Sequence, residues 1–119
     1  MRLADLTVSM HDDAVVARLT GEIDKSNTGE LRTSITNATP NDAVGVVLDL
    51  SGVDYIDSAG IQLLFRLRES LRVRGQALRL VIPFGSRVND TLRLAGVERS
   101  VEVVEATDEG LEALASASG

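Results

Sequence analysis

The run Val44–Leu50, near the middle of the chain, is apolar or glycine at every position except Asp49. A nearly continuous apolar run of this kind is typical of a strand that is buried on both faces of a parallel sheet. Parallel neighbours need long crossover connections, which are usually helices. The run therefore predicts an α/β fold, and segments of helical periodicity on either side of it agree.

The other segments follow a regular order along the 119 residues. We expect a hairpin over Val8–Gly21, a helix after Asn27 that ends at Pro40-Asn41-Asp42, the strand Val44–Leu50, a short turn, a helix over Ser58–Arg74, a strand over Leu78–Ile82, a helix from Ser86 to Gly96, a strand over Val101–Val104, and a helix from Thr107. The predicted fold is α/β in the order β-β-α-β-α-β-α-β-α, with about five strands in a mixed, mostly parallel sheet and about four helices. Residues 1–119 are expected to form one domain, with a tail, Ala115–Gly119, that frays.

The helical segments also predict which side chains face the core. Asn27 and Glu30 have the spacing of a capping box, and Ser86 is expected to cap the third helix. The expected inward-facing residues are Leu31, Ile35 and Ala38 in the first helix; Ile61, Leu64, Phe65 and Leu71 in the second, with Leu67 at the side; Val88, Leu92 and Ala95 in the third; and Leu111 and Leu114 in the last.

Charge and composition exclude several classes of partner. Eighteen acidic and twelve basic residues give a net charge of −6, which argues against nucleic acid and anionic membrane surfaces as partners. The chain has no cysteine, so disulfides and thiolate metal sites are excluded. The first residues lack the apolar core of a signal peptide, and no run approaches the ~20 apolar residues of a membrane span. A cytoplasmic protein without membrane insertion is expected.

The stretch Asp57-Ser58-Ala59-Gly60 lies between the central strand and the second helix. Ser58 is therefore expected at a helix N-terminus, where free N–H groups and the helix dipole favour negative charge. A phosphate there would add a charge of about −1.5 to −2. Capping by Asp57 or Ser58 is the commoner role of such residues, whereas a switch requires Ser58 to be exposed. Ala59 and Gly60 are small and would leave the helix start open to a partner.

Catalytic uses of these residues lack the necessary companions. A serine nucleophile needs a base, but the only histidine, His11, falls in the predicted hairpin turn. A phosphate-accepting Asp49 or Asp54 would need an acidic pair after the first strand and a late lysine. Asp12-Asp13 instead lies in the turn, and no lysine follows Val104. A Gly-rich phosphate loop and a metal-ligand cluster are also lacking, so no enzyme, cofactor or metal is predicted.

Two further sets of charged residues were considered as possible sites. Glu22, Asp24 and Lys25 follow the second strand; they form either a solvated loop or part of the edge beside Ser58, because carboxyl ends of strands in an open α/β sheet share one edge. The arginines of the second helix are divided between two faces, which favours a solvated surface over a basic patch.

Four segments together resemble the STAS-domain family, and within it the bacterial anti-sigma factor antagonists. They cover nearly the whole chain in the family's order: Leu19-Thr20-Gly21-Glu22-Ile23-Asp24, Val47–Val53, Asp57-Ser58-Ala59-Gly60-Ile61 and Val88–Val97. The chain departs from the family pattern at Ala59, where many members have a second serine, and at Phe84-Gly85-Ser86. Asn27 and Thr28 lie where relatives vary.

The resemblance implies a phosphorylation switch and no catalytic activity. The unphosphorylated protein would bind an anti-sigma factor, itself a serine kinase with a histidine-kinase-like ATP fold, and so release a sigma factor. Phosphorylation of Ser58 would block binding, and a PPM-type serine phosphatase would reverse it. The implied partner-binding residues are Glu22, Asp24, Lys25, Asp57, Ser58, Ala59 and Gly60, and the free protein would be a monomer.

Alternative roles within the same family stay open. The chain could be a cytoplasmic STAS accessory subunit of a lipid-transport ABC complex, in which it would support an ATPase without being phosphorylated. A sulfate-transporter STAS domain is disfavoured because no membrane segment is attached.

Overall fold

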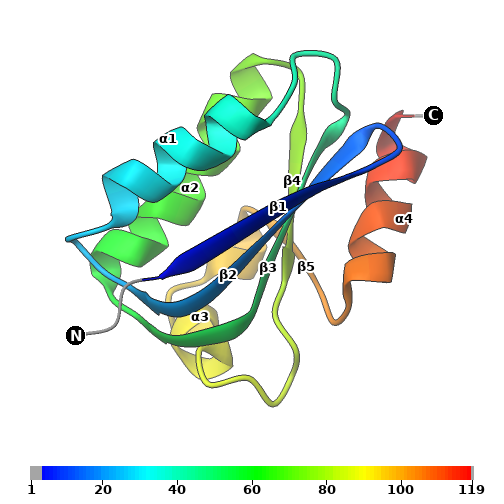
Figure 1. Cartoon of the computed structure of the whole chain (residues 1–119). Helices are drawn as coiled ribbons and strands as arrows, with labels where there is room; N and C mark the ends of the chain where they lie inside the picture. Colours follow the sequence, from blue (N-terminus) through cyan, green and yellow to red (C-terminus); the bar gives the residue numbers. More distant parts are fainter. Residues whose placement is uncertain (1–3, 119) are drawn as a thin grey trace.

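The computed structural model describes residues 4–118, which form one five-stranded sheet and the helices around it (Figure 1). The elements are β1 (Asp5–His11), β2 (Ala14–Ile23), α1 (Thr28–Ala38), β3 (Gly45–Ile56), α2 (Ser58–Val73), β4 (Ala77–Val81), α3 (Asn89–Leu94), the short 3-10 helix η1 (Val97–Arg99), β5 (Glu102–Val104) and α4 (Thr107–Ser118). The strand order is β1-β2-β3-β4-β5; β1 is antiparallel to β2 and every other pair is parallel. The predicted fold class and element order are confirmed.

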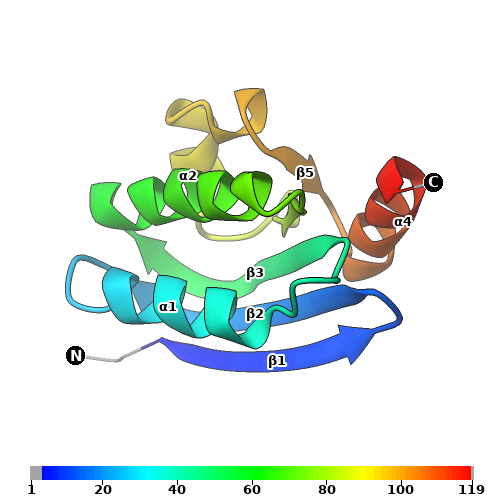
Figure 2. The ribbon, with the colours of Figure 1, turned by 90° about the horizontal axis from the view of Figure 1, so that it is seen from above.

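Helices cover the two faces of the sheet unequally. α1 and α2 lie side by side on one face, and α4 lies on the other (Figure 1). Figure 2 shows α4 near the β1–β2 turn, at the opposite end of the sheet from the start of α2. Successive strand side chains point to opposite faces, so the sheet contributes to two aliphatic clusters. The larger one lies under α1 and α2, and the smaller one, around Val47 and Leu114, lies under α4.

The strand β3 is much longer than the apolar run that predicted it. It continues through Ile56, where a short turn was expected, because residues 52–56 pair with the end of β2. β2 likewise does not end at Gly21. Gly21 has φ = +96° and lies at an irregularity in the pairing, beyond which the strand reaches Ile23. A bulge of this kind lets a strand bend and still continue.

The buried helix faces differ in detail from the predicted ones. In α1, Leu31 and Ile35 are buried as expected, but Ala38 is exposed and the next residue, Thr39, is buried. In α2 the fully covered side chains are Leu63, Leu64, Leu67 and Leu71, whereas Ile61 and Phe65 are only partly buried. This face is wider than predicted because α2 packs against α1 as well as the sheet.

The third helix begins later than predicted. Ser86 does not cap it: the Ser86 carbonyl accepts the Asn89 N–H (3.2 Å) in a preceding turn, and the Ser86 hydroxyl is buried without a partner. Val88 and Leu92 are buried, but Ala95 is exposed. Gly75 and Gly96, with φ of +75° and +72°, follow α2 and α3 as predicted.

The remaining boundaries move by small amounts. β4 is shifted by one residue from Leu78–Ile82, and β5 begins one residue after Val101. α4 buries Leu114 and partly buries Leu111, and it continues to Ser118, so most of the tail expected to fray belongs to its last turn. Gly119 lies outside the described residues. Within residues 4–118, no helix is long and apolar enough to cross a membrane.

Candidate functional site

The start of α2 is fixed by the residue that precedes it. Asp57 alone separates Ile56, the last residue of β3, from Ser58, the first residue of α2. Its carboxylate Oδ1 accepts the backbone N–H of Gly60 at 3.0 Å, which makes Asp57 the N-cap. Its own N–H donates to the Ile23 carbonyl at 3.2 Å. These two bonds fix the helix start to the ends of both β2 and β3.

Because Asp57 caps the helix, the Ser58 hydroxyl is left free. Ser58 is exposed, and its side chain has no hydrogen-bond partner among residues 4–118. The first N–H groups of a helix have no acceptor within it, and the positive end of the helix dipole lies at the same place. The exposed hydroxyl therefore lies where an added anionic group would be favoured electrostatically.

The segment Glu22–Lys25, called the Glu22–Lys25 loop below, consists of the last two residues of β2 and the two residues that follow them, and it lies directly beside this helix start. The Lys25 N–H donates to Asp57 Oδ2 at 3.4 Å, and Glu22 pairs with Tyr55 where β2 and β3 end. Lys25 is exposed, whereas Glu22 and Asp24 are half-buried. Of the two alternatives for these residues, the structure supports the shared edge.

Asn27 has a different role from the predicted capping box. Its side chain makes no cap hydrogen bond to α1. Instead, Oδ1 accepts the Asp24 N–H at 3.1 Å and Nδ2 donates to the Glu22 carbonyl at 2.9 Å. Asn27 is 9% exposed. This buried side chain therefore holds the Glu22–Lys25 loop in place through its two hydrogen bonds to the backbone of Asp24 and Glu22. The sequence spacing gave no signal of this contact, which depends on the path of the loop.

Asp24 is held within the same loop by Ser26. The hydroxyl and N–H of Ser26 both donate to Asp24 Oδ1, the N–H at 2.9 Å. Hydrogen bonds to the charged form stabilise it, so Ser26 lowers the pKa of the Asp24 carboxyl. Asp24 therefore keeps its negative charge beside the helix start at neutral pH.

Gly60 does not leave the helix start open, contrary to the sequence-based expectation. It is buried, and a Cβ placed on it would overlap Ile56 Cγ1 and lie 3.1 Å from Ile23 Cγ2. The first turn of α2 therefore packs tightly onto the ends of β2 and β3. Ala59 is half-buried, so Ser58 and the Glu22–Lys25 loop are the accessible parts of this region.

We expect Asn27→Ala to loosen the loop without disrupting the sheet. The change leaves the Asp24 N–H and the Glu22 carbonyl without their partners, at a cost of about 1–2 kcal/mol in the free energy of unfolding. Urea denaturation followed by circular dichroism measures the loss, and amide hydrogen exchange locates it. Faster exchange at residues 22–25, with β3 and β4 unchanged, is the expected pattern. Unchanged exchange in the loop would contradict the role given to Asn27.

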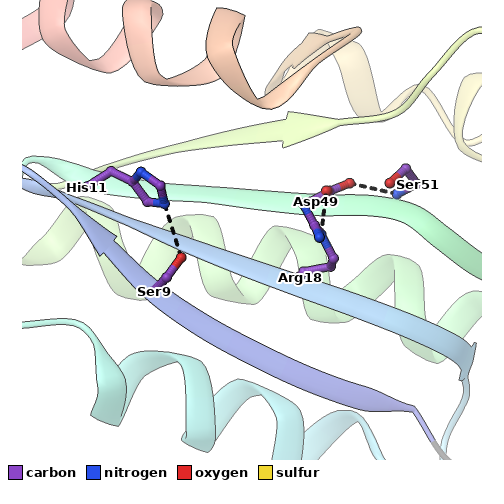
Figure 3. Close-up of polar contacts among 5 residues, drawn as sticks. All are labelled: Ser9, His11, Arg18, Asp49 and Ser51. Carbon is purple, nitrogen blue, oxygen red and sulfur yellow. Dashed lines mark hydrogen bonds and ion pairs between the residues drawn. The ribbon is translucent and has the colours of Figure 1, made fainter.

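Asp49 lies on the sheet face that does not carry α1 and α2 (Figure 3). The Arg18 Nε donates to its Oδ2 at 3.0 Å, and its Oδ1 accepts the Ser51 N–H at 2.9 Å. Its side chain is only 4% exposed. A covered, paired carboxylate of this kind supports the structural interpretation of Asp49 and not that of a phosphate acceptor.

The only histidine is far from Ser58. His11 ends β1 at the β1–β2 turn, and its Nε2 lies 3.2 Å from the Ser9 hydroxyl (Figure 3). Among residues 4–118, no group of three His, Cys, Asp or Glu side chains is placed to hold a metal ion. Arg72 of α2 pairs with Glu69 one turn earlier at 2.6 Å, and Arg74, the residue after α2, donates to the Thr39 carbonyl at 2.6 Å.

A mixed five-stranded sheet, with a capped helix and a free serine after its central strand, defines a class of small α/β domains. The profile of the STAS domain matches residues 5–110. The chain therefore belongs to the STAS-domain family.

Several of the known proteins similar to this chain are described as anti-sigma factor antagonists. The anti-sigma-F factor antagonist RsfB of Mycobacterium tuberculosis is 25% identical over 107 residues, covering 89% of this chain and 85% of that protein. The crystal structure of an anti-sigma factor antagonist from Mycobacterium paratuberculosis matches with a TM-score of 0.78 at 24% identity, covering 94% of both chains. The unphosphorylated form of the anti-sigma factor antagonist SpoIIAA matches with a TM-score of 0.69 at 22% identity, covering 97% of this chain and 99% of that one. A phosphorylated form of SpoIIAA from Bacillus has the same fold, with a TM-score of 0.63 at 17% identity over 92% of this chain and 99% of that one.

Proposed function

We propose that this chain is an anti-sigma factor antagonist controlled by phosphorylation of Ser58. In its unphosphorylated form it binds an anti-sigma factor that is also a serine kinase, and so releases a sigma factor for transcription. It acts as a binding partner and kinase substrate, not as a catalyst. The names of its relatives support the class of protein, and the free Ser58 hydroxyl at the start of α2 supports the switch.

The observation that carries the proposal is that Asp57, and not Ser58, caps α2. Capping is the ordinary use of a serine at a helix start, but here Asp57 makes the cap bond to Gly60. Ser58 is exposed and free for a kinase to reach. No structural task of the described residues needs its hydroxyl.

A phosphate on Ser58 would act through the surface and not through the core. It would add about two negative charges next to Asp57, and Asp24 lies in the adjacent loop. The N-terminus of α2 offsets part of this repulsion within the protein, typically by 0.3–1 kcal/mol. An approaching partner would have no such compensation, because it would meet the concentrated charge or have to desolvate it.

The proposed contact surface consists of Asp57, Ser58 and Ala59 at the start of α2, Glu22 near the end of β2, and Asp24 and Lys25 just after that strand. Gly60 contributes by bringing α2 close to the strands, since it is itself buried. The further partner is a PPM-type serine phosphatase that restores the hydroxyl. The proposal places the protein in the cytoplasm, as a monomer until it binds.

The test is affinity capture from the native bacterium, with purified wild-type protein, Ser58→Ala and Ser58→Asp as baits. Mass spectrometry identifies the captured proteins and any phosphate on Ser58. Wild type and Ser58→Ala are expected to retain a kinase-fold anti-sigma factor, whereas Ser58→Asp loses it. Ser9→Asp, which adds the same charge to the exposed strand β1, is the matched control and retains the partner. An ABC-transporter ATPase held equally by all baits would instead support the accessory-subunit alternative.

Ser58→Asp is also expected to leave the fold intact. The side chain is exposed and the new carboxylate lies at a helix N-terminus, so the change in the free energy of unfolding stays within about 0.5 kcal/mol. Thermal melting of the variant and of Ser9→Asp measures this. A large loss of stability in Ser58→Asp would mean that the charge acts on the core and not on the interface.

A further inference from the structure

Two adjoining hollows form a groove between α1 and α2, which lie side by side on one face of the sheet (Figures 1 and 2). The first hollow, of about 110 Å³, lies near the starts of the two helices, and Thr28 and Ala59 belong to its wall. The second hollow is more open and extends toward the end of α2, where Ser70 and Val73 line it. Because Ala59 directly follows Ser58, this α1–α2 groove begins at the proposed contact surface.

Two arginines, one from each helix, lie where the two hollows meet. Arg32 of α1 and Arg66 of α2 line both of them. Both side chains are exposed, and neither guanidinium has an ion-pair or hydrogen-bond partner among residues 4–118. The pattern of α2 alone gave no sign of this pair, because Arg32 belongs to a different helix.

The groove is positively charged, although the chain as a whole has a net charge of −6. Among the described residues, no carboxylate lines the hollow near Ser58. The second hollow contains Glu69, but Arg72 binds that carboxylate at 2.6 Å. Arg32 and Arg66 therefore keep two positive charges that the fold itself does not compensate.

A partner that contacts Ser58 also reaches this groove. A standard interface buries roughly 800 Å² of each partner, a patch roughly 30 Å across. Arg66 lies eight residues after Ser58 on the same helix, which is about 12 Å along the helix axis. A patch of standard size centred on Ser58 therefore includes Arg66 and, across the groove, Arg32.

The chemistry of the two arginines indicates what the partner places there. A guanidinium is always charged, and its planar fork matches the geometry of a carboxylate. On the strand side of Ser58, the contact surface instead carries the carboxylates of Asp57, Glu22 and Asp24. Opposite charges at the two ends of one surface fix the orientation of a complementary partner.

We propose that the anti-sigma factor places an acidic segment in the α1–α2 groove, where Arg32 and Arg66 bind its carboxylates. This inference rests on the proposed function and extends its contact surface from the start of α2 along both helices. The two arginines then help to determine which anti-sigma factor the chain recognises, because a partner without acidic residues at this place would leave both guanidiniums unpaired.

The test uses the full chain and the purified anti-sigma factor that the Ser58→Ala bait retains. All variants carry Ser58→Ala, so that the kinase cannot modify them. Adding Arg32→Gln with Arg66→Gln is expected to raise Kd by roughly tenfold or more in isothermal titration calorimetry, because charge-assisted contacts are lost. The affinity of the Ser58→Ala parent is also expected to fall more steeply with added salt than that of the glutamine variant. Equal affinities and equal salt dependence would overturn the proposal.

Arg93→Gln with Arg99→Gln is the matched control, since it changes the net charge equally. Both residues are exposed and lie outside the groove lining, on α3 and η1, which Figure 2 shows on the far side of α2 from α1. This control is expected to bind as the parent does. All four arginines are exposed, so folding of both variants is expected, and thermal melting checks it. Equal loss of affinity in the two variants would mean that only net charge matters and would overturn the assignment to the groove.

Amide hydrogen exchange of the anti-sigma factor tests the chemistry of the bound segment. The parent is expected to protect a segment that contains Asp or Glu, and the Arg32/Arg66 variant is expected to protect that segment less. If protection is the same with both proteins, no acidic segment lies in the groove.

The outcomes separate this inference from the proposed function. If the parent retains an anti-sigma factor that the glutamine variant binds equally well, the groove is outside the interface and the proposed function stands. If Ser58→Ala retains no anti-sigma factor, the proposed function fails, and the inference about the groove fails with it.

Discussion

Leu64→Ala is expected to lower the free energy of unfolding by about 2–5 kcal/mol. Leu64 lies on α2, is fully buried and belongs to the large cluster between the sheet and the two helices. Removing its three outer carbons deletes their buried contacts and leaves a cavity, because neighbouring side chains relax only partly. Urea denaturation of both proteins, monitored by circular dichroism, gives the difference.

Leu94→Ala is the matched control for this prediction. Leu94 is also at a helical position, but its side chain is 90% exposed, so the same deletion should change the free energy of unfolding by no more than about 0.5 kcal/mol. Similar losses in the two variants would contradict the assignment of Leu64 to the core. The helix that carries Ser58, six residues before Leu64, would then not be anchored in the core by Leu64.

The local patterns of the chain predicted its helices well because amphipathic periodicity is a property of neighbouring residues. The start of α2 at Ser58 was predicted from the capping residues there, and its predicted end at Arg74 lies one residue beyond the observed end at Val73. Leu63, however, was missed as a buried residue. It lies near Thr28 and Gly29 of α1, and a single helix pattern carries no information about which neighbouring helix covers it.

Strand lengths were predicted less well because partners remote in sequence set them. Residues 51–56 contain serine, glycine and aspartate, which are typical of turns. The second half of β2 nevertheless pairs with them and keeps both segments extended as far as Ile23 and Ile56. Pairing between strands thus overrode local composition at both ends that lead to the site.

The same distinction applies to the site. The position of Ser58 at a helix start followed from its own neighbours. The proximity of Glu22–Lys25 was one of two alternatives, which the shared edge of parallel strands suggested but did not decide. The choice of Asp57 as the cap and the support of the loop by Asn27 could not be predicted. Both depend on hydrogen-bond geometry that residue types alone leave open.

Gly60→Val is expected to lower the free energy of unfolding by about 2–3 kcal/mol. The first added carbon would overlap Ile56 Cγ1 and come within 3.1 Å of Ile23 Cγ2. Both isoleucines are buried and β-branched, so they have little freedom to move aside. The helix would have to lift from the ends of β2 and β3, which also strains the cap bond from Gly60 to Asp57.

Gly29→Val distinguishes this crowding from a general effect of losing glycine in a helix. Gly29 is in the first turn of α1, is exposed, and has open space where a side chain would be added. Glycine and valine have similar helix propensities, so the control should change the free energy of unfolding by less than about 0.5 kcal/mol. Equal effects at the two positions would show that Gly60 is not a packing residue.

The outcome also bears on why a glycine, Gly60, lies two residues after Ser58. If Gly60→Val loses stability but its folded fraction still binds the anti-sigma factor with the affinity of the wild type, the glycine serves the packing of α2 and the exposed Ser58 serves recognition. If the variant is as stable as Gly29→Val and fails only in binding, the small residue is needed by the partner. The close approach of α2 to Ile56 and Ile23 favours the first result.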